Sequence, residues 1–357
     1  MKKLTLTSII FVLLFASCQT IYGQKVIKHY IFFSRDRELI HDSSFYSISG
    51  IDGAQITYVW KQLEPRKNTY DFSEIEADLD FLNSKGKKLF IQIQDVTFSS
   101  SRILTPNYML NDTTYHGGSD PQYWEDDDGK LVKGGWVARR WDTAVANQYR
   151  ELLVALAKKF DGRIEGINIP ETAIDIVDPE GRYPMAYSDS IYIEELKKTM
   201  LTLSTHFKQS VPILYANFMP GDSKANLNEL YEYAEEIGLG MGGPDIKVYR
   251  KGQMENSYPL IRDIAGKVPI GLAVQDGNYS IRNPKTDRQV TISEILEFAQ
   301  NYLMVDYIFW CTEEPYYSEQ VLPLLNMESL KLLLRSPHPN LQSWREYTTW
   351  HRPCDWQ

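Results

Sequence analysis

A carboxylate follows an apolar, β-branched run near the middle of this chain. Residues 164–169 (IEGINI) read as a buried strand, and Pro170 and Glu171 come immediately after it. In a chain that alternates strands and helices, this position lies at the carboxyl end of a parallel strand, where (β/α)8 barrels build their active sites. A carboxyl group held there is suited to proton transfer. The sequence therefore predicts Glu171 as a general acid/base; the structural alternative is a strand-end carboxylate paired with an arginine.

Polar and aromatic residues also stand in or near the other strand ends, and these are candidates for contact with a substrate. Amides donate and accept hydrogen bonds, and an aromatic ring offers an apolar face for stacking. Asp276 is the candidate for a second catalytic group. The candidates for substrate binding are Trp310, Gln275, Asn217, Trp60, Asp95, Trp136, Asn168 and Glu313.

The elements that must position these residues alternate regularly along the chain. Helical periodicity separates short apolar runs, and one further strand is expected within Tyr30–Ile51. Eight β/α units select a (β/α)8 (TIM) barrel, an α/β fold, over an open doubly wound sheet. Besides 164–169, the expected strands are Gly53–Trp60, Lys88–Gln94, Val211–Asn217, Gly238–Asp245, Val268–Asp276 and Tyr307–Trp310.

Capping residues mark where several helices begin. Asp142 precedes a helix with an apolar face that runs to Phe160. Thr291 with Glu294, and Ser73 with Glu76, have the spacing of a capping box, in which each side chain bonds the other residue's backbone N–H. These signals predict helix starts at all three places.

A long insertion, about 96–141, follows the third predicted strand and therefore projects over the catalytic face. It is rich in Tyr and Trp, and an insertion of this length inside a compact domain is usually functional. Its acidic run at 125–128 resembles a calcium loop, but the alternating ligands and the distal Glu of an EF-hand are missing. The Asp128-Gly129 turn between Tyr123-Trp124 and Leu131-Val132 favours a hairpin instead.

Composition narrows the class of protein. The 357 residues suffice for one barrel domain, expected over 24–357, and the 43% hydrophobic content is ordinary for a globular protein. A net charge of −9 argues against nucleic acid as a partner. Aromatic residues make up 13% of the chain, which suits sugar stacking as well as a large core. No His/Cys spacing predicts a metal, and no cofactor is expected.

The N-terminus has the pattern of an export signal. Lys2-Lys3 precede the apolar run Leu4–Phe15, so residues 1–23 are expected to be removed as a signal peptide. Within it, FASC at 15–18 resembles a lipobox, which predicts acylation of Cys18 after a leader of 1–17 and anchoring in the cell envelope. Cleavage after Gly23, giving a secreted or periplasmic protein, is the alternative.

Cysteine usage adds little. After export, Cys311 and Cys354 remain, and two cysteines in an exported protein can pair. Because Cys311 falls in a predicted buried strand, a free core thiol is the favoured reading.

Several of these pieces together resemble one group of enzymes, the clan A glycoside hydrolases, which are (β/α)8-barrel glycosidases. YVWKQLEP at 58–65 followed by YDF at 70–72 resembles their signature after the second strand, and GKKLFIQI at 86–93 resembles their third strand. Glu171 matches their acid/base after the fourth strand, and Trp310 matches an aromatic sugar platform after the eighth. The resemblance implies the same fold and glycosidase activity, without selecting a family within the clan.

Two departures from the clan pattern bear on activity. Clan members carry Asn immediately before the acid/base, where this chain has Pro170, with Asn168 two residues earlier. At the seventh strand, where the clan places its nucleophilic Glu, this chain has Gln275, which cannot act as an anion. The resemblance extends over residues 53–310.

Glycoside hydrolysis generally needs two carboxyl groups, about 5–5.5 Å apart for retention and about 6.5–9.5 Å apart for inversion. Asp276 is nearest the clan position and is the favoured second group, and an inverting mechanism is a hypothesis because Asp is shorter than Glu. The alternatives are Glu313, Glu314, Asp245 and Asp95.

Two functions follow from the sequence. The favoured one is an exported glycoside hydrolase acting on a poly- or oligosaccharide with Glu171 as general acid/base. The alternative is a catalytically silent carbohydrate-binding lipoprotein on the same scaffold, which Gln275 favours. Part of this preference rests on likeness of fold.

Overall fold

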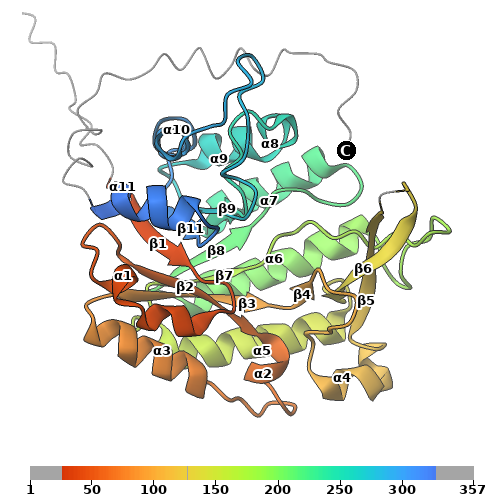
Figure 1. Ribbon diagram of the computed structural model, residues 1–357. Coiled ribbons are helices and arrows are strands. Elements are labelled where there is room, and N and C mark those ends of the chain that lie inside the picture. Colours follow the sequence, from red (N-terminus) through yellow and green to blue (C-terminus); the bar gives the residue numbers. More distant parts are fainter. Residues whose placement is uncertain (1–25, 127, 327–357) are drawn as a thin grey trace, which may run out of the picture.

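The computed structural model describes residues 26–126 and 128–326. Within them, eight parallel strands close into a barrel in the order β1-β11-β10-β9-β8-β7-β3-β2 (Figure 1). The barrel strands are β1 (Lys28–Phe32), β2 (Gly53–Val59), β3 (Lys88–Gln94), β7 (Gly166–Ile169), β8 (Val211–Tyr215), β9 (Gly240–Gly243), β10 (Ile270–Val274) and β11 (Tyr307–Cys311). The predicted (β/α)8 fold is confirmed. The predicted leader, Cys18 and Cys354 lie outside the described residues.

The barrel interior is filled by side chains and is a packed core. Tyr30, Phe90, Ile213 and Phe309 form its apolar layer, with no more than 1% of any of them exposed. Glycine is required where the strands approach most closely: a Cβ on Gly242 would lie 1.7 Å from the carbonyl oxygen of Gly271. Alternate residues of each strand point inward, so both faces of every strand are buried, as expected of a parallel barrel.

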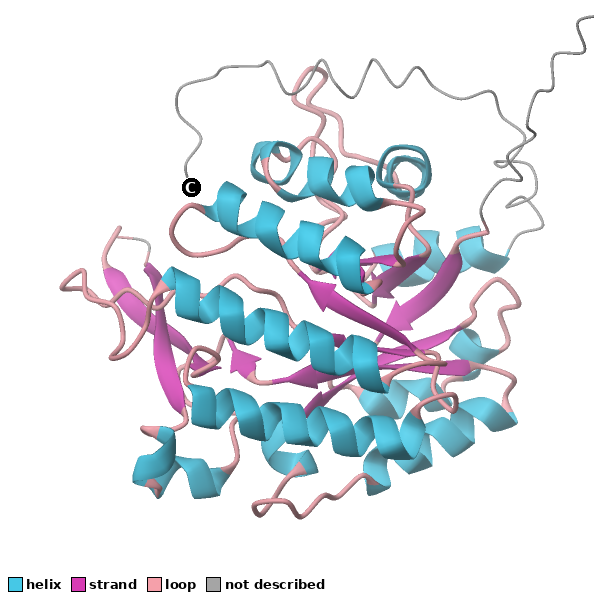
Figure 2. Ribbon diagram, turned by 180° about the vertical axis from the view of Figure 1, so that it is seen from behind, coloured by secondary structure: helices cyan, strands magenta, loops and turns pink. Residues whose placement is uncertain are grey.

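Helices cover the outside of the barrel (Figure 2). Each buries one stripe against the strands, as for α5, where Val145, Leu152 and Phe160 are almost completely buried. The larger helices are α3 (Ser73–Ser84), α5 (Thr143–Phe160), α6 (Asp189–His206), α7 (Ser223–Ile237), α9 (Ser257–Ile264) and α10 (Ile292–Phe298); the short ones are α1 (Ser43–Tyr46), α2 (Trp60–Leu63), α8 (Lys251–Glu255) and α11 (Leu322–Asn326). None of the helices among residues 26–126 and 128–326 has both the length and the apolar character for a membrane span.

The three predicted helix starts have different outcomes. Asp142 caps α5 by accepting from the N–H groups of Ala144 and Val145, and Thr291 with Glu294 forms a complete capping box at α10. The capping box predicted at Ser73 and Glu76 is wrong, because the helix begins one residue earlier than predicted. Phe72 occupies the cap position there, and the carboxylate of Asp71 accepts from both the N–H and the hydroxyl of Ser73.

The insertion folds as a small antiparallel sheet beside the barrel, in the order β4-β6-β5 (Figure 1). It comprises β4 (Val96–Thr97), α4 (Asn107–Asn111), β5 (Ser119–Glu125) and β6 (Leu131–Ala138). Trp124 pairs with Val132 across the β5–β6 hairpin, which confirms the hairpin predicted around Asp128-Gly129. Tyr123 N–H donates to the carbonyl of Asp175, so β5 docks on the loop that follows Glu171.

Glu64 stands beside the barrel as a structural residue. Its side chain is fully buried and accepts hydrogen bonds from Trp60 Nε1, the N–H of Asn68, Tyr108 Oη and Gln148 Nε2 at 2.6–3.0 Å. Four donors compensate the burial of one carboxylate. They tie α2, the following loop, the insertion and α5 together.

Candidate active site

Glu171 stands two residues beyond the end of β7, the fourth barrel strand. Its side chain is partly buried, and Asn217, two residues beyond β8, donates from Nδ2 to its Oε2 at 2.6 Å. The backbone is held as well: Arg140 donates to the carbonyl oxygen of Glu171 at 2.7 Å, and Tyr192 Oη donates to that of Thr172 at 3.0 Å. The structure thus places Glu171 at the carboxyl-terminal rim with a fixed backbone.

The surroundings of Glu171 favour its protonated form. Burial raises the pKa of this carboxyl group, and the negative charges of Asp245 and Asp175 act in the same direction. The hydrogen bond from Asn217 and the charge of Arg140 oppose them without reversing the direction. A carboxyl group that keeps its proton to higher pH than usual has the property required of a general acid.

Arg140, at the end of the insertion, is the cation nearest the backbone of Glu171. Its guanidinium binds the carboxylate of Asp95 in a bidentate pair, with Nε–Oδ2 at 2.8 Å and Nη2–Oδ1 at 2.6 Å. Asp95 is 2% exposed, so the prediction that it binds substrate directly is wrong. Since it pairs with the arginine that holds Glu171, its place is behind the site.

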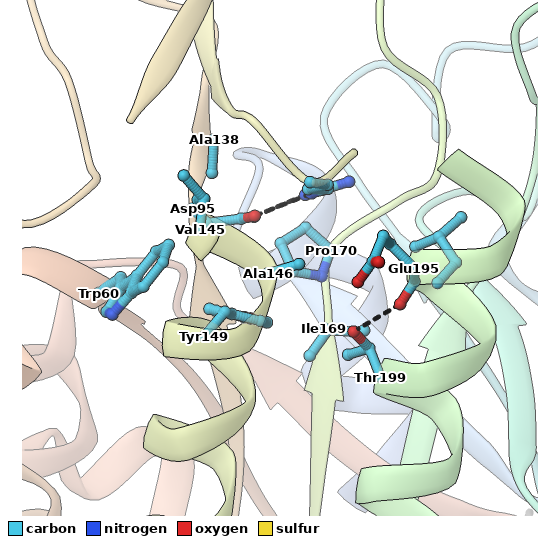
Figure 3. Close-up of a pocket in the computed structure, with 12 residues that line it drawn as sticks. Trp60, Asp95, Ala138, Val145, Ala146, Tyr149, Ile169, Pro170, Glu195 and Thr199 are labelled. Atoms are coloured by element: carbon cyan, nitrogen blue, oxygen red, sulfur yellow. Dashed lines mark hydrogen bonds and ion pairs between the residues drawn. The ribbon is translucent and has the colours of Figure 1, made fainter. Parts of the chain in front are cut away.

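This pair lines a cavity between the barrel wall and α5 and α6 (Figure 3). Trp60, Tyr149, Pro170 and Glu195 are among its lining residues, and each is buried. The cavity therefore lies under α5 and α6 and reaches Pro170, the residue before Glu171.

Asp245 follows β9, the sixth strand, by two residues and is held from three sides. Asn278 Nδ2 donates to its Oδ1 at 2.9 Å, and Lys247 Nζ lies 3.1 Å from its Oδ2. Tyr258 Oη donates to its carbonyl oxygen at 3.2 Å. The side chain of Asp245 is 16% exposed, so its carboxyl group reaches solvent while these contacts hold it in place.

A second group of side chains occupies the ends of β10 and β11. The ligand atoms of Asp276, Cys311 and Glu313 lie within 4.8 Å of one another, and the N–H of Gly277 donates to Glu313 Oε2 at 2.8 Å. This is the set of described residues with donors close enough to share a metal ion. Burial raises the pKa of the Cys311 thiol to about 12, so the thiol is protonated at neutral pH. The prediction of a free, buried Cys311 is confirmed.

Three further substrate-binding predictions are wrong for one reason, which is burial. Trp310 is 0% exposed and donates to Nδ1 of His29, with which its ring stacks under the helix layer. Trp60 is also fully buried and donates to Glu64. Asn168 is 0% exposed and accepts from Gln55 Nε2 inside the barrel. None of the three has surface to offer a sugar.

The remaining candidates differ in exposure: Gln275 and Trp136 are partly exposed, and Asn217 is buried. Gln275, two residues beyond the inward-pointing Ala273, shares its inward orientation and is partly exposed. Trp136 on β6 is partly exposed, with Nε1 donating to the carbonyl of Ser100 and Lys133 Nζ 3.5 Å from its ring centroid. Asn217 is the one candidate that directly contacts the carboxyl group of Glu171.

Sequence reasoning missed Arg140 and Asp175. The only local signal was the pair Arg139-Arg140 at the end of an otherwise acidic, aromatic insertion. Arg139 in turn pairs with Asp120 and donates to the carbonyl of Met185. Both arginines therefore bind the hairpin to the loop that carries Glu171.

Comparison with known proteins extends this description of the fold. No protein-family model matches the chain, and no curated protein matches it in sequence. Among solved structures, β-galactosidase from the psychrophilic Marinomonas ef1 is similar with a TM-score of 0.54 and 8% identity, covering 90% of this chain and 62% of that chain. The chain has a glycoside hydrolase-like (β/α)8 fold.

Two other solved structures are similar at lower scores. One is a GH5_18 variant from Bifidobacterium longum in complex with Manβ1-4GlcNAc, with a TM-score of 0.48 and 12% identity, covering 85% of this chain and 73% of that chain. The other is a mutant of xylanase A from P fluorescens subsp. cellulosa in complex with xylopentaose. It has a TM-score of 0.49 and 12% identity, and the match covers 91% of this chain and 99% of that chain.

Proposed function

We propose that this chain is an exported glycoside hydrolase that cleaves glycosidic bonds in a poly- or oligosaccharide, with Glu171 as the general acid. The observation that carries the proposal is the state of Glu171: a partly buried carboxyl group at the rim of the barrel, whose pKa is raised by burial and by neighbouring carboxylates. The glycoside hydrolase-like fold supports it, since sites of this architecture occupy the same rim.

The chemistry assigned to Glu171 is proton donation to the glycosidic oxygen as the bond to the anomeric carbon breaks. Asn217 orients the carboxyl group through Oε2, which leaves Oε1 to carry the proton toward the mouth. Arg140 and Tyr192 fix the backbone, so the acid keeps one position while a sugar binds. Such positioned proton transfer contributes about 10²–10⁴-fold to a rate.

Export is part of the proposal and rests on the leader pattern in residues 1–23. Acylation of Cys18 would anchor the protein in the cell envelope, and cleavage after Gly23 would release it. Mass spectrometry of the mature N-terminus from a bacterial host distinguishes an acylated Cys18 from a free Gln24.

The deciding experiment measures release of reducing ends from a broad panel of plant, algal and host glycans. Glu171→Gln is expected to lower the rate by about 10²–10⁴-fold. The control is Glu236→Gln, the same chemical change at an exposed position of α7, which is expected to behave as wild type.

Affinity electrophoresis on the same panel tests the second candidate function. Gln275 at the clan's nucleophile position favours a binding protein. Retardation by a glycan without any release of reducing ends would establish the binding function and overturn the hydrolase.

A further inference from the structure

We propose that Asp245, at the end of the sixth strand, is the second catalytic carboxylate and that it acts as the general base on a water molecule opposite Glu171. This inference rests on the proposed function and completes it. It replaces Asp276, which the position of the clan nucleophile favours, and it predicts inversion at the anomeric carbon.

The order of the strands brings Glu171 and Asp245 close together along the rim. β7 pairs with β8, and β8 pairs with β9, so Glu171 and Asp245 flank one intervening strand end. Each residue follows its strand by two positions, and the register of the strands, continued past their ends, sets Glu171 in line with Gly243, two residues before Asp245. Two strand spacings separate their backbones by about 10 Å. Inverting enzymes hold their two carboxyl groups about 6.5–9.5 Å apart, a separation within reach of two side chains that flank one strand end.

Buried side chains fix the position of Asp245. Asn278 is 0% exposed, donates Nδ2 to the carboxylate and accepts from the N–H of Ile246 at 3.0 Å. Tyr258, 1% exposed, bonds the backbone on both sides, at the carbonyl of Asp245 and the N–H of Lys247. Buried polar side chains are costly unless they are satisfied. Here the buried side chains of Asn278 and Tyr258 both form hydrogen bonds that hold the partly exposed Asp245.

Glu171 and Asp245 also interact electrostatically. The charge of Asp245 reaches Glu171 and favours the proton on it, together with Asp175, while Arg140 acts in the opposite sense. The negative charge of Glu171 also contributes to the raised pKa of Tyr192. Lys247 and Asn278 contact the two oxygens of Asp245. An acid and a base need two carboxyl groups in different surroundings, and the neighbours of Glu171 differ in this way from those of Asp245.

Asp276 stands in a different environment. It is exposed, and its nearest ligand-type neighbours are Cys311 and Glu313 on the opposite side of β10 from β9. It lies three strand positions from β7. The described contacts between Asp276 and its neighbours lead toward β11, away from the acid.

The proposed hydrolysis is a single displacement at the anomeric carbon. A water molecule loses one proton to Asp245 as its oxygen bonds to the anomeric carbon. The bond from that carbon to the glycosidic oxygen breaks, and Glu171 transfers its proton to the leaving oxygen. Exchange with solvent then returns the proton from Asp245 and restores the one on Glu171.

The test compares Asp245→Asn with Asp276→Asn in the full mature protein on a glycan that wild type cleaves. Asp245→Asn is expected to lower kcat by about 10²–10⁴-fold, and Asp276→Asn by less than about tenfold. ¹H NMR of the first product is expected to show the inverted anomer. A large loss in Asp276→Asn with activity retained in Asp245→Asn, or a retained anomer, would overturn the proposal.

A measurement that needs no substrate separates this inference from the proposed function. ¹³C NMR of glutamate labelled at Cδ follows the Glu171 carboxyl group, assigned by the signal lost in Glu171→Gln. Its pKa is expected to fall in Asp245→Asn, because a negative charge that favours the proton has been removed, and to change less in Asp276→Asn. An unchanged pKa in Asp245→Asn would overturn the pairing even if the protein is a hydrolase.

If wild type cleaves no glycan, the hydrolase and the base role fall together. The pairing of the two carboxyl groups would still be read from the titration. Melting temperatures of all variants, with Glu236→Gln as the neutral reference, establish that a loss of activity is not a loss of fold.

Discussion

Two arcs of the barrel rim carry carboxylates, and they differ in how the protein surrounds them. The acid arc comprises Glu171, Asn217 and Asp245, after β7, β8 and β9, and the thiol arc comprises Asp276, Cys311 and Glu313, after β10 and within or after β11. In the acid arc, buried amides and an arginine fix each carboxyl group or its backbone. In the thiol arc, the hydrogen bond to the carboxylate of Glu313 comes from the exposed Gly277 backbone.

The difference shows how burial assigns chemistry to similar side chains. Burial of Glu171 beside two other carboxylates raises its pKa, which is the property that the proposed general acid needs. Burial of the Cys311 thiol raises its pKa to about 12 and makes it unreactive. The same physical effect therefore favours a protonated carboxyl group in one arc and an unreactive thiol in the other.

The largest expected effect on stability comes from breaking the support of the acid arc. Arg140→Met leaves Asp95 buried without its partner, and we expect a loss of about 3–5 kcal/mol in the free energy of unfolding. Urea unfolding measures it. Lys267→Met, which removes the exposed pair with Glu235, is expected to cost about 0–1 kcal/mol. Equal losses would show that Arg140 has no special part in holding the arc.

A smaller effect is expected under the thiol arc, at Trp310. Trp310→Phe removes buried volume and the hydrogen bond to His29, for which we expect a loss of about 1–3 kcal/mol. Affinity for any glycan that the protein binds should be unchanged, because the indole does not reach the surface. Weaker glycan binding at unchanged stability would restore Trp310 as a sugar platform.

The raised pKa of Glu171 has a consequence for stability that depends on pH. A carboxyl group with a higher pKa in the folded state contributes stability at low pH, and that contribution is lost as the pH rises through the folded pKa. Glu171→Gln removes this loss of stability at high pH, because glutamine does not ionise. Its stability relative to wild type should therefore increase from pH 4 to pH 8 in urea unfolding. A difference independent of pH would show that the carboxyl group is not perturbed.

The smallest effect concerns the reactivity of the thiol arc. Alkylation of Cys311 by iodoacetamide requires the thiolate, which burial disfavours. Peptide mapping should find Cys311 unmodified in the native protein at pH 8 and modified after unfolding in urea. Rapid native labelling would mean that the thiol is exposed and that the two arcs resemble one another more than the structure indicates.

The sequence by itself determined the order of elements and the position of Glu171, the proposed acid. Lys88–Gln94 is a strand with the predicted bounds, Asp142 caps its helix, and the Asp128-Gly129 hairpin forms as expected. The position of Glu171 after the fourth strand could be predicted, because an apolar run and the carboxylate that follows it are local features of the sequence. Periodicity, capping and turn chemistry act between residues close in sequence, so the sequence is sufficient to predict them.

Only the tertiary structure decided which side chains reach the mouth and which carboxylates meet. A barrel strand is buried on both faces, so its sequence does not say whether Trp310 points inward or outward. The bidentate pair of Arg140 with Asp95 joins residues 45 positions apart, and Asn278 reaches Asp245 across 33. Such contacts depend on barrel closure and on the register between strands, which are set by packing over the whole molecule and leave no signal in a local stretch of sequence.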